Sequence, residues 1–178
     1  MRIYAIRHGQ THMNLNNLLN SQLDDGLTEE GMKQARQAAK TIPKSVQRIY
    51  ASSLRRTRQT AEIVNEELKL PLAFHDELME VNFGSLSGAE YSGEKKVHHL
   101  AMDYDWHQFG GESVDDVKKR VIHMLDAIKA ESGDGEALIV AHGGIIRMLY
   151  YLEAGKHVEQ IDNGSLHSFD LDKILANQ

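Results

Sequence analysis

The sequence contains no cysteine, and this absence narrows the chemistry available to the protein. Without a thiol, the chain has no disulfide bond, no thiolate ligand for a metal and no cysteine nucleophile. Any nucleophile must therefore be an oxygen or nitrogen side chain. The lack of cysteine also fits a reducing compartment.

Long apolar runs and an excess of basic residues are missing as well. No stretch approaches the length of a membrane span, and the first residues lack the apolar core of a secretory signal. Lys and Arg number 20 against 26 Asp and Glu, giving a net charge of −6. General charge attraction to nucleic acid or to a membrane surface is therefore not expected. We expect a cytoplasmic protein with neither nucleic acid nor membrane as a partner.

The remaining composition is that of an ordinary globular protein. The 178 residues are 41% hydrophobic and 26% charged, which is enough for one well-formed core. We found no internal repeat, low-complexity tract or linker-like segment. The sequence therefore predicts a single domain over residues 1–178.

Strand and helix patterns alternate along this domain. Short apolar runs predict strands at residues 1–6, 46–51, 72–74, 137–141 and 166–171. Helical patterns with capping residues predict helices at residues 28–42, 54–68, 114–131 and 145–153, with Thr28, Ser52 or Ser53, and Ser113 as N-caps. Loops are expected at residues 15–25 and 76–88, and residues 89–111 show only weak helical character. The alternation predicts a three-layer α/β/α fold with a mostly parallel central sheet.

Basic and imidazole side chains follow three of the predicted strands. Arg7 and His8 come directly after the first strand, and His142 comes directly after the strand at 137–141. In open α/β sheets, ligands bind outside the carboxyl ends of the strands. An arginine beside an imidazole suits an anionic substrate and a nitrogen nucleophile. Two histidines placed in this way are hard to assign to packing alone.

Three further arginines follow the strand at 46–51, in the first turns of the next helix. Cations at a helix N-terminus oppose the helix dipole, so Arg55, Arg56 and Arg58 call for another explanation. A bound phosphate would supply one, because the free backbone N–H groups at that end also favour an anion. Successive helical residues diverge by ~100°, so at most one or two of these side chains can reach the same site.

The ordered motifs of the chain resemble those of the histidine phosphatase superfamily, the phosphoglycerate-mutase-like group. The signature Arg-His-Gly stands at Arg7-His8-Gly9, and the family pattern Ser-Pro-Leu-x-Arg-Ala-x-Gln-Thr-Ala is matched from Ser52 to Ala61, which selects Arg56. The other matches are Leu27 to Ala35, Leu78 to Gly84, Gly110 to Ser113 and Val140 to Gly144. Each match alone is weak, but the ordered set covers nearly the whole chain.

The resemblance implies a role for each site residue. His8 would attack phosphorus and form a phosphohistidine, while Arg7, Arg56 and a protonated His142 would neutralise the phosphoryl oxygens. Glu80 would protonate the leaving oxygen and then activate water. Asn14, Thr11, Gln22 and Gly143 would contribute phosphate or substrate contacts. The remaining histidines, including His98, His99, His107 and His123, are expected at the surface.

Departures from the family pattern leave the catalytic positions intact. Ser53 and Thr57 replace a common proline and alanine, while Ser21-Gln22 and Leu86-Ser87 replace a frequent Gly-Arg and Trp-Glu. The last two changes put the identity of the substrate in doubt. The Glu-Arg-His-Tyr-Gly segment and longer middle insertion of the cofactor-dependent mutases are absent here. We therefore favour a phosphatase over a phosphoglycerate mutase.

The sequence leaves the substrate and two other function classes open. A sugar phosphate, a phosphoglycerate, an α-ribazole phosphate-type precursor and a phosphorylated protein are all compatible. A metal-dependent hydrolase would use His8, His142 and Glu80 as ligands, but the nearby Arg7 and Arg56 would repel a cation. A catalytically silent phosphate-binding module is the other alternative. No metal or cofactor is expected, and apolar stripes on the last helices would serve either a homodimer interface or the core.

Overall fold

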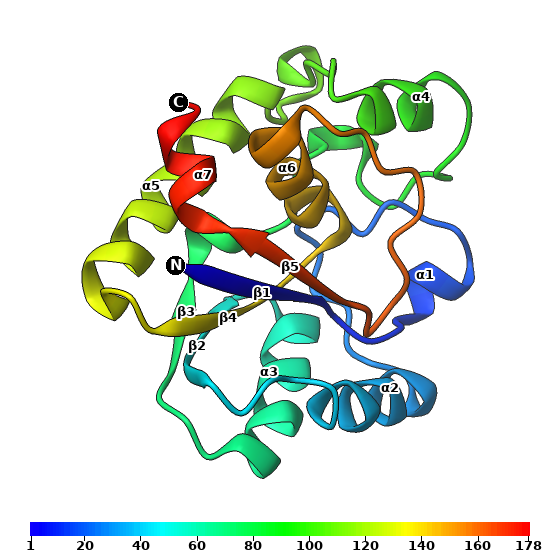
Figure 1. The fold of residues 1–178 in the computed structure, drawn as a ribbon. Helices are drawn as coiled ribbons and strands as arrows, with labels where there is room; N and C mark the ends of the chain where they lie inside the picture. Colours follow the sequence, from blue (N-terminus) through cyan, green and yellow to red (C-terminus); the bar gives the residue numbers. More distant parts are fainter.

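A five-stranded sheet forms the centre of the computed structural model, which describes residues 1–178 (Figure 1). The strand order is β3-β2-β4-β1-β5, and every neighbouring pair is parallel except β1 with β5. The strands are β1 (Arg2–Arg7), β2 (Val46–Ser52), β3 (Leu72–His75), β4 (Glu136–Ala141) and β5 (Leu166–Asp170). The predicted mostly parallel sheet is confirmed.

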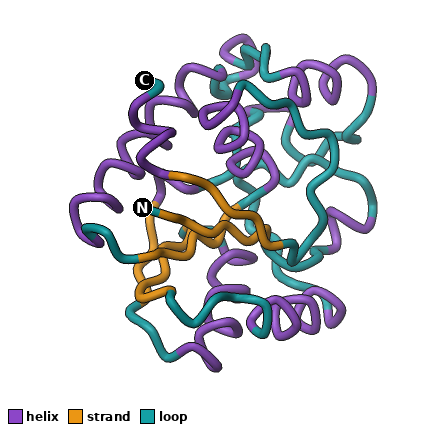
Figure 2. Tube along the Cα trace, in the orientation of Figure 1, coloured by secondary structure: helices purple, strands orange, loops and turns teal.

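Helices cover both faces of this sheet. Figures 1 and 2 show α2 and α3 on one face and α5, α6 and α7 on the other. The helices are α1 (His12–Leu15), α2 (Glu29–Ala39), α3 (Arg55–Leu68), α4 (Gly93–Ala101), α5 (Val114–Ser132), α6 (Gly143–Ala154) and α7 (Leu171–Ala176). Short 3₁₀ turns occupy η1 (Asp76–Leu78), η2 (Gly84–Leu86) and η3 (His107–Phe109). The three-layer α/β/α prediction is therefore correct. No helix is long and apolar enough to cross a membrane.

The central strand β4 shows why the apolar runs become buried strands. All residues from Ala137 to Ala141 are fully buried. Because side chains alternate between the faces of a strand, Ile139 joins the apolar cluster under α5 and α6, whereas Leu138 and Val140 join the cluster under α2 and α3. A strand covered on both faces needs apolar residues at every position, as this sequence has.

Capping side chains fix the start of two of the predicted helices. The Thr28 side chain accepts a hydrogen bond from the Gly31 N–H at the start of α2. Ser113 and Asp116 form a reciprocal capping box at the start of α5. Helix α3 forms where it was predicted, but the expected N-cap at Ser52 or Ser53 is wrong, because the N-cap is Leu54 and no side chain caps it.

Some elements differ from the sequence expectation. Strand β5 runs antiparallel to β1, and the chain then forms α7, which the sequence did not predict. Helix α1 lies where we expected a loop to begin, and α4 gives residues 93–101 a definite helix. These elements are only four to nine residues long, so tertiary contacts decide their conformation.

Candidate active site

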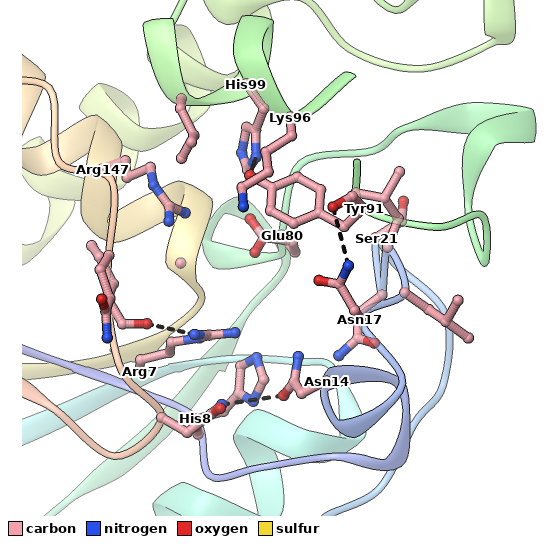
Figure 3. Close-up of a pocket in the computed structure, with 18 of the residues that line it drawn as sticks. Arg7, His8, Asn14, Asn17, Ser21, Glu80, Tyr91, Lys96, His99 and Arg147 are labelled. Atoms are coloured by element: carbon pink, nitrogen blue, oxygen red, sulfur yellow. Dashed lines mark hydrogen bonds between the residues drawn. The ribbon is translucent and has the colours of Figure 1, made fainter. Parts of the chain in front are cut away.

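A cavity of about 470 Å³ opens at the carboxyl edge of the sheet. Register pairs Arg7 with Ala141, so the ends of β1 and β4 lie side by side, and β2 ends next to β4. The cavity is lined by residues from the end of β1, from α1, α4 and α6, and from loops near them, among them Arg7, His8, Asn14, Glu80, Tyr91, Lys96, His99, Gly143 and Arg147 (Figure 3). The predicted crevice at the strand ends is therefore present.

The imidazole of His8 is held in one orientation and one protonation state. It is buried, and its Nδ1 donates a hydrogen bond to the Gly9 carbonyl at 2.7 Å. Burial first, and then the nearby Arg56 and Arg7 charges, lower the pKa of His8 well below its usual value. With its proton on Nδ1, the ring keeps an unprotonated Nε2, which is the form needed for nucleophilic attack.

The guanidinium groups of Arg7 and Arg56 are close enough to the His8 imidazole to lower its pKa. Arg56 is fully buried, and its Nη2 and Nη1 donate to the carbonyls of Ser21 and Leu23 at 2.6 and 2.9 Å. Burial lowers the pKa of Arg56 to about 10, which still leaves it charged at neutral pH. The Nε atoms of Arg7 and Arg56 are both buried without a partner. Both are buried N–H donors without a partner, but only Arg7 is among the residues that line the cavity.

His142 lies next to His8 and is also buried. The two ring centroids are 5.2 Å apart, and His142 Nε2 shares a 2.8 Å hydrogen bond with Ser52 Oγ. Burial, followed by the Arg56 charge, lowers the pKa of His142 well below its usual value. A neutral His142 is therefore favoured, against our expectation of a protonated one. Its Nδ1 is buried and has no partner, and His142 is not among the residues that line the cavity.

Glu80 projects into the cavity above His8 and Arg7 (Figure 3). Its Oε1 accepts from the Val81 N–H at 2.9 Å, and its Oε2 accepts from the Gly144 N–H at 3.3 Å. A Cβ placed on Gly144 would lie 2.3 Å from Glu80 Oε1, so this glycine makes room for the carboxylate. Glu80 is thus oriented by backbone donors and still reaches the ligand space.

The four predicted binding residues occupy different places. Asn14 and Gly143 line the cavity. Thr11 is fully buried as the N-cap of α1, where its hydroxyl accepts from Asn14 N–H and Asn20 Nδ2. Gln22 donates to the Glu80 carbonyl at 3.1 Å and does not line this cavity. Thr11 and Gln22 therefore bond to neighbouring protein groups and do not line the cavity.

Asn14 is itself tied to two segments of the site. Its Oδ1 accepts from Asn163 Nδ2 and from the Thr11 N–H, both at 3.2 Å. Asn163 also donates to the His8 carbonyl at 3.0 Å. The Asn14 amide nitrogen has no partner within the protein and lies on the cavity wall.

Several residues of the site were not found from the sequence. His99 is 4% exposed rather than at the surface, and it shares a 2.8 Å hydrogen bond with the Tyr91 hydroxyl. Arg147 lines the cavity from α6, and Arg120 of α5 holds the backbone before Glu80. The ordered family motifs do not include these positions, and α4 was the least predictable segment. One indirect signal for Arg120 was present in the sequence: Glu112, in the Gly-Gly-Glu-Ser motif, forms an ion pair with it, with 2.7 Å between Glu112 Oε1 and Arg120 Nε.

Metal binding by the same residues finds no geometric basis. No three His, Asp or Glu side chains are grouped so that they could hold a metal ion. The cations Arg7 and Arg56 beside His8 instead suit a phosphoryl group, because an arginine fork bonds well to phosphate oxygens.

Comparisons with known proteins agree with this arrangement. The 2,3-bisphosphoglycerate-dependent phosphoglycerate mutase of Parvibaculum lavamentivorans is 36% identical over 161 residues, which cover 83% of this chain and 77% of the relative. The putative phosphoserine phosphatase 2 of Hydrogenobacter thermophilus is 31% identical, over 91% of this chain and 83% of the relative.

Solved structures and a family model extend the match. A mycobacterial glucosyl-3-phosphoglycerate phosphatase, solved with VO3, is 27% identical with a TM-score of 0.85, covering 94% of this chain and 90% of that one. Residues 3–174 match the model of the histidine phosphatase superfamily (branch 1). The chain therefore belongs to the histidine phosphatase superfamily.

Proposed function

We propose that the protein is a metal-independent phosphomonoesterase that acts through a phosphohistidine on a small phosphorylated metabolite. A sugar phosphate, a phosphoglycerate and an α-ribazole phosphate-type compound all belong to this class. The state of His8 is the observation that carries the proposal. A buried neutral imidazole has its Nδ1–H donated to the Gly9 carbonyl, which leaves Nε2 free to attack.

The first chemical step transfers the phosphoryl group to the protein. A bond forms between His8 Nε2 and phosphorus while the bond between phosphorus and the ester oxygen breaks. Arg7 and Arg56 offset the charge on the three non-bridging oxygens through their unpartnered Nε–H groups. Protonated Glu80 gives its proton to the leaving oxygen, so the alcohol departs neutral.

The second step returns the protein to its starting state. Glu80, now a carboxylate, takes a proton from a water molecule that attacks phosphorus. The bond between His8 Nε2 and phosphorus breaks, and inorganic phosphate leaves. General acid–base help of this kind contributes about 10²–10⁴-fold to the rate.

A phosphoglycerate mutase is the alternative that uses the same phosphohistidine. The mutase relative from Parvibaculum lavamentivorans favours it, whereas the phosphatase relatives and the short segment at residues 89–111 favour hydrolysis. A mutase must retain its released intermediate and return the phosphoryl group. We prefer hydrolysis, because the chain lacks the longer middle insertion of the cofactor-dependent mutases.

Phosphate release from 4-nitrophenyl phosphate by EDTA-treated protein tests the proposal. We expect turnover by the wild type and none by His8→Ala, with His123→Ala as a control because that histidine is exposed on α5. Acid-labile ³²P on the protein should appear with wild type and be absent from His8→Ala. Activity that persists in His8→Ala would contradict the mechanism.

Two further assays separate the alternatives. Conversion of 3-phosphoglycerate to 2-phosphoglycerate, dependent on 2,3-bisphosphoglycerate and faster than phosphate release, would establish a mutase instead. Tight binding of inorganic phosphate with no turnover of any phosphomonoester would establish a silent binding module.

A further inference from the structure

Arg147 is a buried cation of the cavity that the chemistry at His8 does not use. Its side chain extends from α6, is 8% exposed and lines the cavity. Figure 3 shows its guanidinium directed into the cavity, with Arg7 lying between it and His8. Arg147 therefore lies farther from His8 than Arg7 does, outside the proposed phosphoryl site.

The hydrogen bonds of Arg147 leave part of its guanidinium free. Nε donates to the Val158 carbonyl at 2.8 Å, and Nη2 donates to the Glu159 carbonyl at 2.7 Å. Nη1 makes no hydrogen bond within the protein, and it lies beside Gly143, 3.0 Å from where a Cβ on that glycine would be. Gly143 is itself a cavity residue, so the free nitrogen is at the cavity wall.

No carboxylate neutralises this charge. None of the ion pairs in the structure includes Arg147. Of the acidic residues on the cavity wall, Glu80 accepts from backbone N–H groups, Asp162 accepts from Gln160 Nε2 at 2.7 Å, and Glu159 offers Arg147 only its carbonyl. A buried charge without a counter-ion is costly, so a bound anion would improve the free energy of this site.

A second cation reaches the same region from α4. Lys96 lines the cavity, makes no ion pair and lies with its Nζ 5.8 Å from the centre of the Tyr91 ring. In Figure 3 its amino group points toward the cavity on the side away from His8. The neutral His99 also lines this part of the cavity, so it adds no competing charge.

We infer that Arg147 and Lys96 form a subsite for a second anionic group of the substrate, a carboxylate or a second phosphate. The inference rests on the proposed function for the position of the first phosphate at His8. It narrows the substrate class to phosphomonoesters that carry another negative group within reach of α6 and α4. Simple neutral alcohols as leaving groups would leave Arg147 unneutralised.

Ligand pairs that differ in the second anion test the subsite without requiring turnover. In a His8→Ala background, calorimetry compares 3-phosphoglycerate with glycerol 3-phosphate, which has a hydroxymethyl group in place of the carboxylate. Fructose 1,6-bisphosphate and fructose 6-phosphate form the second pair. We expect at least one pair to show a preference of about tenfold or more for the ligand that carries the second anionic group, the usual effect of a charged hydrogen bond.

Variants then assign the preference to the two cations. Arg147→Gln should reduce the ratio of affinities to nearly one, and Lys96→Gln should reduce it by several-fold. Lys95→Gln is the matched control, because Lys95 precedes Lys96 on α4 and does not line this cavity. The ratio cancels any general damage to the loop that Arg147 holds, since both ligands of a pair use the same phosphoryl site.

The outcomes separate this inference from the proposed function. A preference in the glycerate pair alone assigns a carboxylate, and one in the fructose pair alone assigns a second phosphate. Equal affinities within both pairs, or a ratio unchanged by Arg147→Gln, would overturn the subsite even if 4-nitrophenyl phosphate is hydrolysed. An Arg147-dependent preference in a protein with no phosphatase activity would support the subsite and refute the proposed function.

Discussion

At the scale of single residues, burial decides how the site works. Burial and neighbouring arginines lower the pKa values of His8 and His142, which favours the neutral form of both rings. Positive charge in the site therefore comes from Arg7 and Arg56, whose guanidinium groups resist deprotonation. The His8 imidazole therefore stays neutral beside two cations.

Gly144 is the residue that most directly permits Glu80 to reach the cavity. Gly144→Ala would place a Cβ 2.3 Å from Glu80 Oε1 and 2.9 Å from Val81 Cγ2, so the carboxylate must move. We expect kcat for an alkyl phosphate to fall by about 10²-fold, the lower range for general acid–base catalysis. The effect on 4-nitrophenyl phosphate should be smaller, because its leaving oxygen needs less protonation. Equal losses for the two substrates would argue against Glu80 as the proton donor.

At the scale of elements, α5 positions a segment that is distant in sequence. Arg120 Nη1 donates to the Glu77 and Met79 carbonyls, both at 2.7 Å, and its Nη2 donates to the Glu80 carbonyl at 3.2 Å. Glu112 pairs with the same guanidinium and also accepts from the Asn82 N–H at 2.8 Å. Arg120 and Glu112 thus fix the backbone on both sides of the Glu80 carboxylate.

Replacing Arg120 by lysine should disturb this positioning. Arg120→Lys retains the charge but loses the planar fork that bonds three carbonyls and Glu112, so we expect kcat to fall by about tenfold, a loss of about 1.4 kcal/mol. The inhibition constant for inorganic phosphate should change little, because the phosphoryl site at His8 is untouched. Lys119→Arg is the control on the same helix, at an exposed position. A parallel rise in the phosphate inhibition constant would indicate a wider structural role.

The start of α5 gives a stability prediction of its own. Ser113→Ala removes the hydroxyl that accepts from the Asp116 N–H and leaves that donor without its cap. We expect the free energy of unfolding to decrease by about 1 kcal/mol, as is typical for N-cap residues. Urea denaturation of both proteins measures this change. Ser113→Thr should retain most of the stability, and a loss as large as in the alanine variant would show that the hydroxyl is not responsible.

The sequence predicted elements best where local signals were strong. The buried strands β1, β2 and β4 and the capped helices α2 and α5 could be predicted from apolar runs and capping residues. The same strand ends, with the family motifs, identified His8, Arg56 and His142. Arg147 and His99 could not be found in this way, because their proximity to the cavity depends on how α6 and α4 pack. The protonation state of His142 could not be predicted from the sequence either, because it depends on the burial of the ring.

At the scale of the whole molecule, three histidines at the site are buried and neutral. His8, His99 and His142 are each at most 4% exposed, and burial is the first cause of the lowered pKa in all three. The value for His99 is about 3. An unfolded histidine titrates near 6.5, so the unfolded chain takes up these protons at a higher pH than the folded chain does.

The free energy of unfolding should therefore fall as the pH falls below about 6.5. Below this unfolded pKa and above the folded ones, the unfolded state binds up to three more protons, so acid shifts the equilibrium toward it. Each histidine contributes up to about 1.4 kcal/mol per pH unit in this window, and above pH 7 their contribution to the slope vanishes. Urea denaturation at pH values from 7.5 to 4.5 measures the slope. His99→Phe should reduce the slope by about one proton, or about 1.4 kcal/mol per pH unit; a slope equal to that of the wild type would show that His99 does not titrate as its burial implies.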